Sequence, residues 1–403
     1  MTVPVVRRIS IFPLTIPLRR RVEHAASTRA VADPVVVAVE LQNGVVGYGE
    51  TLPRKYVTGE TVESVVASVQ SVFVPNLMSF HPATFGDALD ALDSLPWQSE
   101  SGVAVPAARA AVELALLDAS MRTFGRGMDD VVRFLDLPGF EQPGSLPVIR
   151  FCGVVATSSV QKMRRLLRLM YWSGLRDFKL KVGFEGDVRF VRVALDYLSA
   201  TIARARASLR VDANGAWSVE EAQAWIHATR DLAISAIEQP LAKENDSFLA
   251  RVKDTMREVH GETAPLIMHD ESLVTIEDAE RIAEMGVADA FNIRISKCGG
   301  MFPALRLAWF ARRRGIAIQL GCMVGETGLL SAAGLRFLSV CPNVRWAEGC
   351  FGRLLLKSDI VSRSLRFGFG GKPPALGGDG LGVEVDRQRL DQVCETKPIT
   401  LTL

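Results

Sequence analysis

The sequence predicts an α/β protein built from a (β/α)8 barrel and, before it, a smaller α+β domain. From about residue 145, short apolar runs alternate with amphipathic helical patterns, with roughly the spacing of one βα unit. The first 140 residues instead read as hairpin strands followed by helices. An open doubly wound sheet is the alternative for the repeated part. Units of similar spacing without a G-x-G-x-x-G turn favour the barrel.

The first part, placed at 1–140, is a predicted α+β domain. Its clearest element is a hairpin, because residues 35–40 and 45–48 are apolar and flank a turn at Gln42, Asn43 and Gly44. Helical patterns follow the hairpin. This order of elements is typical of an α+β domain.

The barrel is predicted over residues 141–365. Ser218 and Glu221 predict a capping box at the start of one of its helices, and Gly174 predicts the end of another. The tail, 366–403, opens with a Gly- and Pro-rich stretch and is expected to return to the first domain. The expected barrel strands lie at 146–155, 177–182, 208–213, 234–240, 266–272, 289–295, 316–322 and 343–349.

Composition narrows the class of protein. Hydrophobic residues make up 48% and charged residues 23%, with a net charge of +2, which is typical of a soluble globular protein and argues against nucleic acid as a partner. No apolar run is long enough for a membrane span, and the N-terminus lacks a signal-peptide core. The 6 cysteines show no C-x-x-C spacing, so we expect reduced thiols and a cytoplasmic protein.

Acidic residues end three consecutive predicted strands: Asp212, Glu238 and Asp270. In a barrel, chemistry takes place at this end of the strands. Three neighbouring carboxylates repel one another unless a cation neutralises them, and all-oxygen ligation suits Mg²⁺, with Mn²⁺ as the alternative metal. The other interpretation is that each acid caps a helix or forms a salt bridge.

Two lysines, Lys179 and Lys181, lie on the predicted strand before these acids. Side chains at i and i+2 of a strand point to the same face, so the two ammonium groups would lie side by side. A lysine near another cation has a lowered pKa and can act as a base near neutral pH. The alternative is a structural pair neutralised by Asp212 and Glu238.

These motifs together resemble the enolase superfamily, and within it the muconate-lactonizing subgroup, which is mandelate racemase- and muconate cycloisomerase-like. The resemblance covers nearly the whole chain and rests on FKLKVG, RVDANGAW, IEQP, HDES and NIRISKCGG, one for each successive strand. It implies a modified TIM-type barrel with a capping domain. It also implies Mg²⁺ bound by Asp212, Glu238 and Asp270, Lys181 as the base, and Lys179 as the residue that lowers its pKa and helps to hold the substrate carboxylate.

One position departs from the subgroup, which usually has a second lysine where this chain has Arg294. Arginine is effectively always protonated and is therefore a poor base. Arg294 is expected to stabilise an anion, which favours one-base chemistry over racemisation. Lys297 is expected to be structural and to face away, unless the strand has ended and the loop turns it back.

The resemblance also indicates where the substrate is selected. Loops of the capping domain are expected to close over the barrel mouth, and the matching segments here are 17–28 and 53–61. Cationic residues in these loops would meet an additional anionic group on the substrate. The alternative, favoured for Arg19, Arg20 and Arg21, is a solvated basic surface. The candidate substrate-binding residues are His24, Tyr56, Glu326 and Glu348.

The implied reaction is Mg²⁺-dependent abstraction of a proton α to a carboxylate through an enediolate, as in a muconate cycloisomerase-like isomerase. Three alternatives stay open: a dipeptide or N-acylamino acid epimerase or racemase, an acid-sugar or hydroxy-acid dehydratase, and a non-catalytic carboxylate-binding homologue. We expect a small-molecule carboxylate substrate, no nucleic-acid or membrane partner, and a homo-oligomer.

Overall fold

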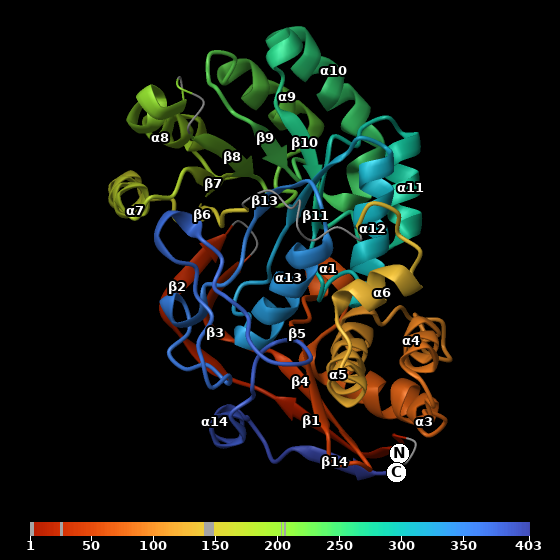
Figure 1. The fold of residues 1–403 in the computed structure, drawn as a ribbon. Helices are drawn as coiled ribbons and strands as arrows, with labels where there is room; N and C mark the ends of the chain where they lie inside the picture. The colour runs from red at the N-terminus through yellow and green to blue at the C-terminus, as the bar shows by residue number, and fades with distance from the viewer. Residues whose placement is uncertain (1–3, 25–26, 141–148, 203, 205–206) are drawn as a thin grey trace.

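The computed structural model describes residues 4–24, 27–140, 149–202, 204 and 207–403, so residues 146–148 of the first predicted barrel strand lie outside it. The chain forms an eight-stranded parallel barrel beside a domain with an antiparallel sheet (Figure 1). The predicted fold class is confirmed. No helix among the described residues is long and apolar enough to cross a membrane.

The barrel strands follow one another in chain order around the sheet, all of them parallel. Phe151 bridges to Ala347, and the Cys152 amide donates to the Ala347 carbonyl over 2.9 Å, so the last strand meets the first. The strands are β6 (Gly153–Val155), β7 (Asp177–Lys181), β8 (Ser208–Asp212), β9 (Ala236–Glu238), β10 (Leu266–His269), β11 (Ala290–Ile293), β12 (Ala317–Leu320) and β13 (Val344–Ala347).

The observed strands are shorter than the predicted apolar runs because the chain turns away from the sheet as soon as each strand reaches the barrel mouth. After β9, for example, Gln239 has a φ of 38°. The helices between the strands are α7 (Val160–Trp172), α8 (Asp187–Ile202), α9 (Val219–Ala228), α10 (Leu249–His260), α11 (Ile276–Glu284), α12 (Met301–Arg313) and α13 (Gly328–Val340). Short 3₁₀ helices are η3 (Lys243–Phe248), η4 (Gly261–Thr263), η5 (Gly352–Leu354) and η6 (Phe369–Gly371).

The capping domain is built on a four-stranded antiparallel sheet in the order β14–β1–β4–β5. Its strands are β1 (Val6–Pro13), β4 (Val35–Leu41), β5 (Val46–Thr51) and β14 (Ile399–Thr402), the last reached from α14 (Arg387–Val393). The hairpin predicted around Asn43 is therefore β4–β5. Because β14 pairs with β1, the first and last strands lie side by side in this sheet (Figure 1).

A separate two-stranded ribbon, β2 (Ile16–His24) and β3 (Ser27–Ala32), extends from this sheet toward β6 and α7 (Figure 1). The segment 17–28 was expected to be a loop; residues 17–24 lie in β2 and residues 27–28 in β3 instead. The remaining helices of the domain are α1 (Lys55–Thr58), α2 (Val62–Ser68), the π-helix η1 (Val69–Phe73), α3 (Val74–Leu77), α4 (Phe85–Asp93), α5 (Pro106–Phe124) and α6 (Met128–Phe134).

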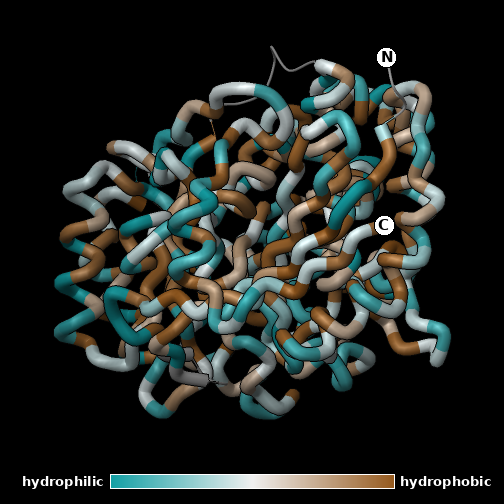
Figure 2. The backbone as a smooth tube through the Cα atoms, turned by 90° about the horizontal axis from the view of Figure 1, so that it is seen from below, coloured by the Kyte–Doolittle hydropathy of each residue, from teal (hydrophilic) through white to brown (hydrophobic). Residues whose placement is uncertain are grey.

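Helix α5 lies directly on β5, and two glycines permit this contact. A Cβ added at Gly47 would lie 2.2 Å from the Ala115 carbonyl oxygen, and one at Gly49 would lie 2.0 Å from that of Ala111. Nearly all of α5 is buried. In the view of Figure 2, hydrophilic segments are frequent at the periphery and hydrophobic ones toward the centre.

Buried carboxylates of the capping domain cap two barrel helices. Glu113 on α5 accepts from the backbone amides of Met301 and Phe302, both over 2.8 Å, at the start of α12. Glu50 on β5 accepts from the amides of Thr327 (2.8 Å) and Leu330 (2.9 Å) at the start of α13. These bonds satisfy amides that a helix leaves free at its N-terminus, so they fix the capping domain to the barrel.

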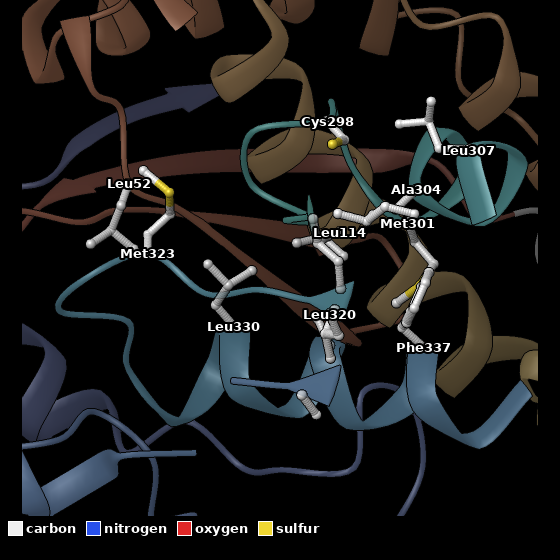
Figure 3. Close-up of a cluster of buried hydrophobic side chains, with 14 of the residues drawn as sticks. Leu52, Leu114, Cys298, Met301, Ala304, Leu307, Leu320, Met323, Leu330 and Phe337 are labelled. Carbon is white, nitrogen blue, oxygen red and sulfur yellow. The ribbon is translucent and has the colours of Figure 1, made fainter. Parts of the chain in front are cut away.

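Apolar packing joins the two parts at the same place. Figure 3 shows Leu114 of α5 in one cluster with Met301 of α12, Leu320 of β12 and Phe337 of α13. Leu52, which follows β5, lies near Met323 in the loop after β12 (Figure 3). The hydrophobic core is therefore continuous from the capping sheet to the barrel mouth.

We expect the substitution Glu113→Ala to lower the free energy of unfolding by about 2 to 3 kcal/mol, because it removes two charge-assisted hydrogen bonds and leaves buried amides unpaired. Denaturant unfolding would measure the change. The matched control is Glu280→Ala on the exposed face of α11, for which we expect a change within about 0.5 kcal/mol. Equal unfolding midpoints for the two variants would contradict the capping role of Glu113.

Candidate active site

A cavity of about 130 Å³ lies at the C-terminal ends of the barrel strands, where the capping domain meets them. Both parts of the molecule contribute to its lining. The polar lining residues from the barrel strands and their loops are Lys179, Lys181, Asn214, Glu271, Arg294 and Glu348. From the capping domain they are Arg20, Arg21, Arg54 and Tyr56.

Asp212, Glu238 and Asp270 lie beneath this cavity, each with no solvent-exposed surface. Asp212 and Glu238 are direct neighbours across β8 and β9. They are absent from the described lining of the cavity, because the lysines and the arginine packed against them line it instead.

Lys179 is the buried centre of this arrangement. Its Nζ lies 3.1 Å from Glu238 Oε2, 3.3 Å from Asp212 Oδ2 and 2.8 Å from the Glu348 carboxylate. Burial lowers the pKa of Lys179, but the three carboxylates around it outweigh burial and hold this pKa well above its ordinary value. Lys179 is thus a protonated structural cation in this arrangement.

Lys181 is placed differently, although it shares a strand face with Lys179. Its Nζ lies 2.5 Å from Asp212 Oδ2 and 2.7 Å from Asn214 Oδ1. Its side chain is 15% exposed, against 2% for Lys179. Lys181 is therefore the lysine of the pair that can reach a molecule in the cavity.

The same contacts shift the pKa values of the acids in opposite directions. Burial raises the pKa of Asp212, but Lys181 and Lys179 outweigh burial and hold that pKa well below its usual range. Burial raises the pKa of Glu238 to about 8, and the charge of Asp212 contributes to the same shift. The contacts are those of the interpretation in which Asp212 and Glu238 neutralise the lysines, and of the two acids Asp212 is the one whose charged form they favour.

Arg294, on the turn after β11, binds Asp270 through Nη2, which also lies 3.7 Å from Glu238 Oε1. Lys297 contacts the same carboxylate, with its Nζ 3.0 Å from Asp270 Oδ1. Of the two orientations considered for Lys297, the one in which the turn brings it back is observed. Asp270 is therefore held by two cations.

The carboxylate oxygens of the three acids are suitable ligands for Mg²⁺. Lys179 contacts both Asp212 and Glu238, and Arg294 contacts both Glu238 and Asp270, so the three acids lie around shared cations. Within the described residues, however, no group of three or more His, Cys, Asp or Glu side chains is arranged to hold a metal ion. Arg294 and Lys297 occupy the oxygens of Asp270. The acids therefore fit a divalent cation in donor type, while in this structure their oxygens are bound to Lys179, Lys181, Arg294 and Lys297.

Arg210 was not anticipated from the sequence and is fully buried below the cavity. Its Nη2 lies 3.1 Å from Glu348 Oε1, and its guanidinium carbon lies 4.8 Å from the Trp346 ring centre. Arg210 precedes Asp212 by two residues on β8, so alternation places both side chains inside the barrel. Glu348 consequently pairs with Arg210 and Lys179, and not with Arg294.

Asn214 was also missed, and it joins two groups at the cavity floor. Its Oδ1 accepts from Lys181, and its Nδ2 donates to Glu271 Oε1 over 3.1 Å. Its φ of 49° lies in the left-handed region, which asparagine tolerates better than most residues. The Asn-Gly pair that follows Asp212 in the sequence is the signal that could have identified this turn.

The fold does not bring all of the predicted substrate-binding residues to one cavity. Tyr56 and Glu348 line the cavity. Glu326 accepts from the Met323 amide over 2.5 Å and lines a smaller cavity of about 10 Å³ that also borders Glu348. His24 ends β2, and its side chain lies outside the described part of the structure.

Comparison with protein families defines the class of protein to which this chain belongs. Residues 162–389 match the family described as enolase C-terminal domain-like, and residues 7–132 match the mandelate racemase / muconate lactonizing enzyme N-terminal domain. The chain belongs to the enolase superfamily, in the subgroup that includes the muconate-lactonizing enzymes.

Individual relatives fall into two kinds of isomerase. The hydrophobic dipeptide epimerase of Enterococcus faecalis is 27% identical over 85% of this chain and 89% of its own. Muconate cycloisomerase 1 of Acinetobacter baylyi is 29% identical over 94% of this chain and 96% of its own. The crystal structure of 2-chloromuconate cycloisomerase from Rhodococcus opacus superimposes with a TM-score of 0.82 at 27% identity, covering 97% of this chain and 100% of that one.

We expect Glu348→Ala to lower the free energy of unfolding by about 3 to 5 kcal/mol, because it leaves the buried Arg210 without its carboxylate. The double variant Arg210→Met/Glu348→Leu should recover most of this loss, since no isolated charge then stays buried. Denaturant unfolding of the single and double variants tests the coupling. Strictly additive losses would show that the two residues do not act as a pair.

Proposed function

We propose that this chain is a muconate cycloisomerase-like isomerase that transfers a proton α to a carboxylate, with Lys181 as the acid–base group. The single observation that carries this proposal is the difference between the two sides of the cavity. Lys181 is a lysine with access to the cavity, whereas Arg294 is an arginine bound to Asp270. One side can exchange a proton and the other holds a fixed charge.

The residues at the cavity have different roles in this proposed reaction. Neutral Lys181 removes the α-proton, or as an ammonium gives it back, while Asp212 and Asn214 hold its nitrogen in place. In cycloisomerisation a substrate carboxylate oxygen bonds to one carbon of a C=C bond. The electron pair of that bond moves toward the other carboxylate, and Lys181 protonates the α-carbon. Arg294 supplies positive charge beside the developing anion.

Asp212, Glu238 and Asp270 would hold Mg²⁺ or, as the alternative, Mn²⁺. Such a cation supplies positive charge next to the carboxylate oxygens on which the second negative charge develops. The donor chemistry of the three acids supports this assignment, as does membership of the superfamily. We further propose a small-molecule carboxylate substrate and a homo-oligomeric assembly.

Epimerisation of a dipeptide or N-acylamino acid is the second candidate, and the epimerases among the relatives favour it. It requires a second group that gives a proton to the opposite face of the substrate. Arg294 occupies the position expected for that group and holds its protons too tightly for this role. The one-base reaction is therefore the better fit to this chain.

We expect Lys181→Ala to lower turnover by about 10² to 10⁴-fold, as is typical for the loss of a general base. Proton NMR in D₂O with Mg²⁺ and a panel of muconates, dipeptides and N-acylamino acids measures the exchange of the α-proton. The control, Lys372→Ala, changes an exposed lysine that does not line the cavity and should leave exchange unaffected. Unchanged exchange in Lys181→Ala would remove Lys181 from the mechanism.

The variant Arg294→Lys tests the one-base assignment with the same substrates. A lysine at this position can exchange a proton, so we expect deuterium to enter with inversion of configuration in the variant and without inversion in the unmodified enzyme. Chiral chromatography of the products distinguishes the two outcomes. Inversion already present in the unmodified enzyme would favour the epimerase.

Addition of Mg²⁺ should raise the thermal unfolding midpoint, because a ligand at 100 times its Kd stabilises the native state by about 2.7 kcal/mol. The variant Asp270→Asn should lose this increase, whatever its own midpoint without metal. Isothermal titration calorimetry gives the affinity directly, and Glu280→Gln is the control. An equal response to Mg²⁺ in Asp270→Asn would rule out Asp270 as a ligand.

A further inference from the structure

The side chain of Asn214 lies between a group that only donates hydrogen bonds and a group that only accepts them. Its Oδ1 lies 2.7 Å from Lys181 Nζ, and its Nδ2 donates to Glu271 Oε1 over 3.1 Å. An ammonium group has no acceptor and an ionised carboxylate has no donor, so only one of the two orientations of the amide satisfies both partners. The two neighbours therefore fix the amide with its oxygen toward Lys181.

This orientation decides where the nitrogen of Lys181 can exchange a proton. A neutral amine has two N–H bonds and one lone pair, which together with Cε occupy the corners of a tetrahedron. Asp212 Oδ2 lies 2.5 Å and Asn214 Oδ1 2.7 Å from this nitrogen, so both N–H bonds have an acceptor at the floor of the cavity. The lone pair is left to point toward the side on which Lys181 borders the cavity. In the ammonium form, the third N–H takes the same corner.

The opposite orientation of the Asn214 amide would block this exchange. Its Nδ2 would then face Lys181 and donate to the lone pair, which could no longer accept a proton from a substrate. The oxygen and nitrogen of an amide have nearly the same size, so its partners alone decide between the two orientations. Glu271 opposes the reversed orientation, because that orientation would place two acceptor oxygens against each other.

Gln239, the glutamine of the IEQP motif, holds the two turns at this distance from each other. It follows β9, which lies between β8 and β10 in the sheet (Figure 1). Its carbonyl oxygen accepts from the amide of Gly215, the residue after Asn214, over 2.7 Å. Its side-chain oxygen accepts from the backbone amides on either side of Glu271, over 3.0 and 3.2 Å. One residue thus fixes the positions from which Asn214 and Glu271 meet.

Stability alone does not explain the placement of Glu271. Its side chain is buried at the cavity floor, and its Oε2 has no hydrogen-bond partner in the part of the chain that the structure describes. Its Oε1 accepts from a neutral amide. Burial of a carboxylate with an unpaired oxygen costs free energy. A role in the site accounts for this cost better than a role in folding.

We propose that Glu271 is a positioning residue for the proton-transferring group: through Asn214 it keeps the reactive corner of the Lys181 nitrogen directed at the cavity. The inference rests on the proposed function, in which Lys181 takes the α-proton or gives it back. When Lys181 takes this proton, the lone pair of its nitrogen forms the new N–H bond and the electrons of the C–H bond stay with the substrate. Glu271 itself neither touches the substrate nor exchanges a proton.

Carbamylation by cyanate tests the proposal without a substrate, because the lone pair of a neutral lysine attacks the reagent. Mass spectrometry of peptides from one digest gives the rate at Lys181 relative to that at the exposed Lys372. We expect Glu271→Gln to lower this ratio about three- to tenfold, since a glutamine permits both orientations of the Asn214 amide. Loss of a nearby negative charge by itself favours the neutral amine and raises the rate, so a fall must come from orientation.

The double variant Asn214→Asp/Glu271→Gln should restore the ratio. The new carboxylate at position 214 accepts from Lys181 in either orientation, the new amide at position 271 can donate to it, and the net charge of the pair is unchanged. The control Glu280→Gln, on the exposed face of α11, should leave the ratio as it is. An unchanged or higher ratio in Glu271→Gln would overturn the proposal, as would a fall that the double variant does not reverse or that the control shares.

Exchange of the α-proton in D₂O separates this inference from the proposed function. With a substrate that the unmodified protein exchanges, Glu271→Gln should lower kcat and leave KM unchanged, and the double variant should recover kcat. If carbamylation follows the expected order but Lys181→Ala exchanges the α-proton normally, the proposed function fails and the positioning role stands. If Lys181→Ala is inactive and Glu271→Gln reacts with cyanate and turns over like the unmodified protein, only the positioning role fails.

Discussion

The arrangement of the site depends on one buried cation, the ammonium group of Lys179. It contacts carboxylates at the ends of three different strands, and removing it would leave Asp212, Glu238 and Glu348 buried near one another without a shared partner. Its position follows from the register of β7, where it is paired with Arg210 of β8 at one level of the barrel. Two residues further on, the same register brings Lys181 beside Asp212 at the level of the cavity. Side chains on one face of a strand repeat every two residues, so the buried Lys179 and the accessible Lys181 lie at successive levels of the barrel.

The capping domain reaches this site because it is fixed to the helices that follow the site strands. Glu113 caps α12 and Glu50 caps α13, and these helices come directly after the segments that carry Arg294 and Met323. Both carboxylates are fully buried, so their hydrogen bonds are not weakened by solvent. The segments that bring Arg20, Arg21 and Tyr56 to the cavity therefore extend from a rigid base.

The sequence predicted the strand order and the residues on the inner face, because alternation and chain order decide both. It placed Lys179, Lys181, Asp212, Glu238 and Asp270 close together for that reason. Beyond the contacts of the two lysines with Asp212 and Glu238, it could not predict which side chains pair, since this depends on barrel curvature and on the turns after the strands. Lys297 returns to Asp270 only because the chain turns after β11, and Arg210 was overlooked because its partner Glu348 lies 138 residues away along the chain.

Charge balance changes the argument for a metal. The acids beneath and around the cavity floor are Asp212, Glu238, Asp270, Glu271 and Glu348, and the cations among them are Lys179, Lys181, Arg210, Arg294 and Lys297. The cations equal the acids in number, so repulsion among the acids does not by itself require Mg²⁺. A divalent cation would add positive charge to this site, which an anionic substrate offsets. Metal and anionic substrate should therefore each strengthen the binding of the other.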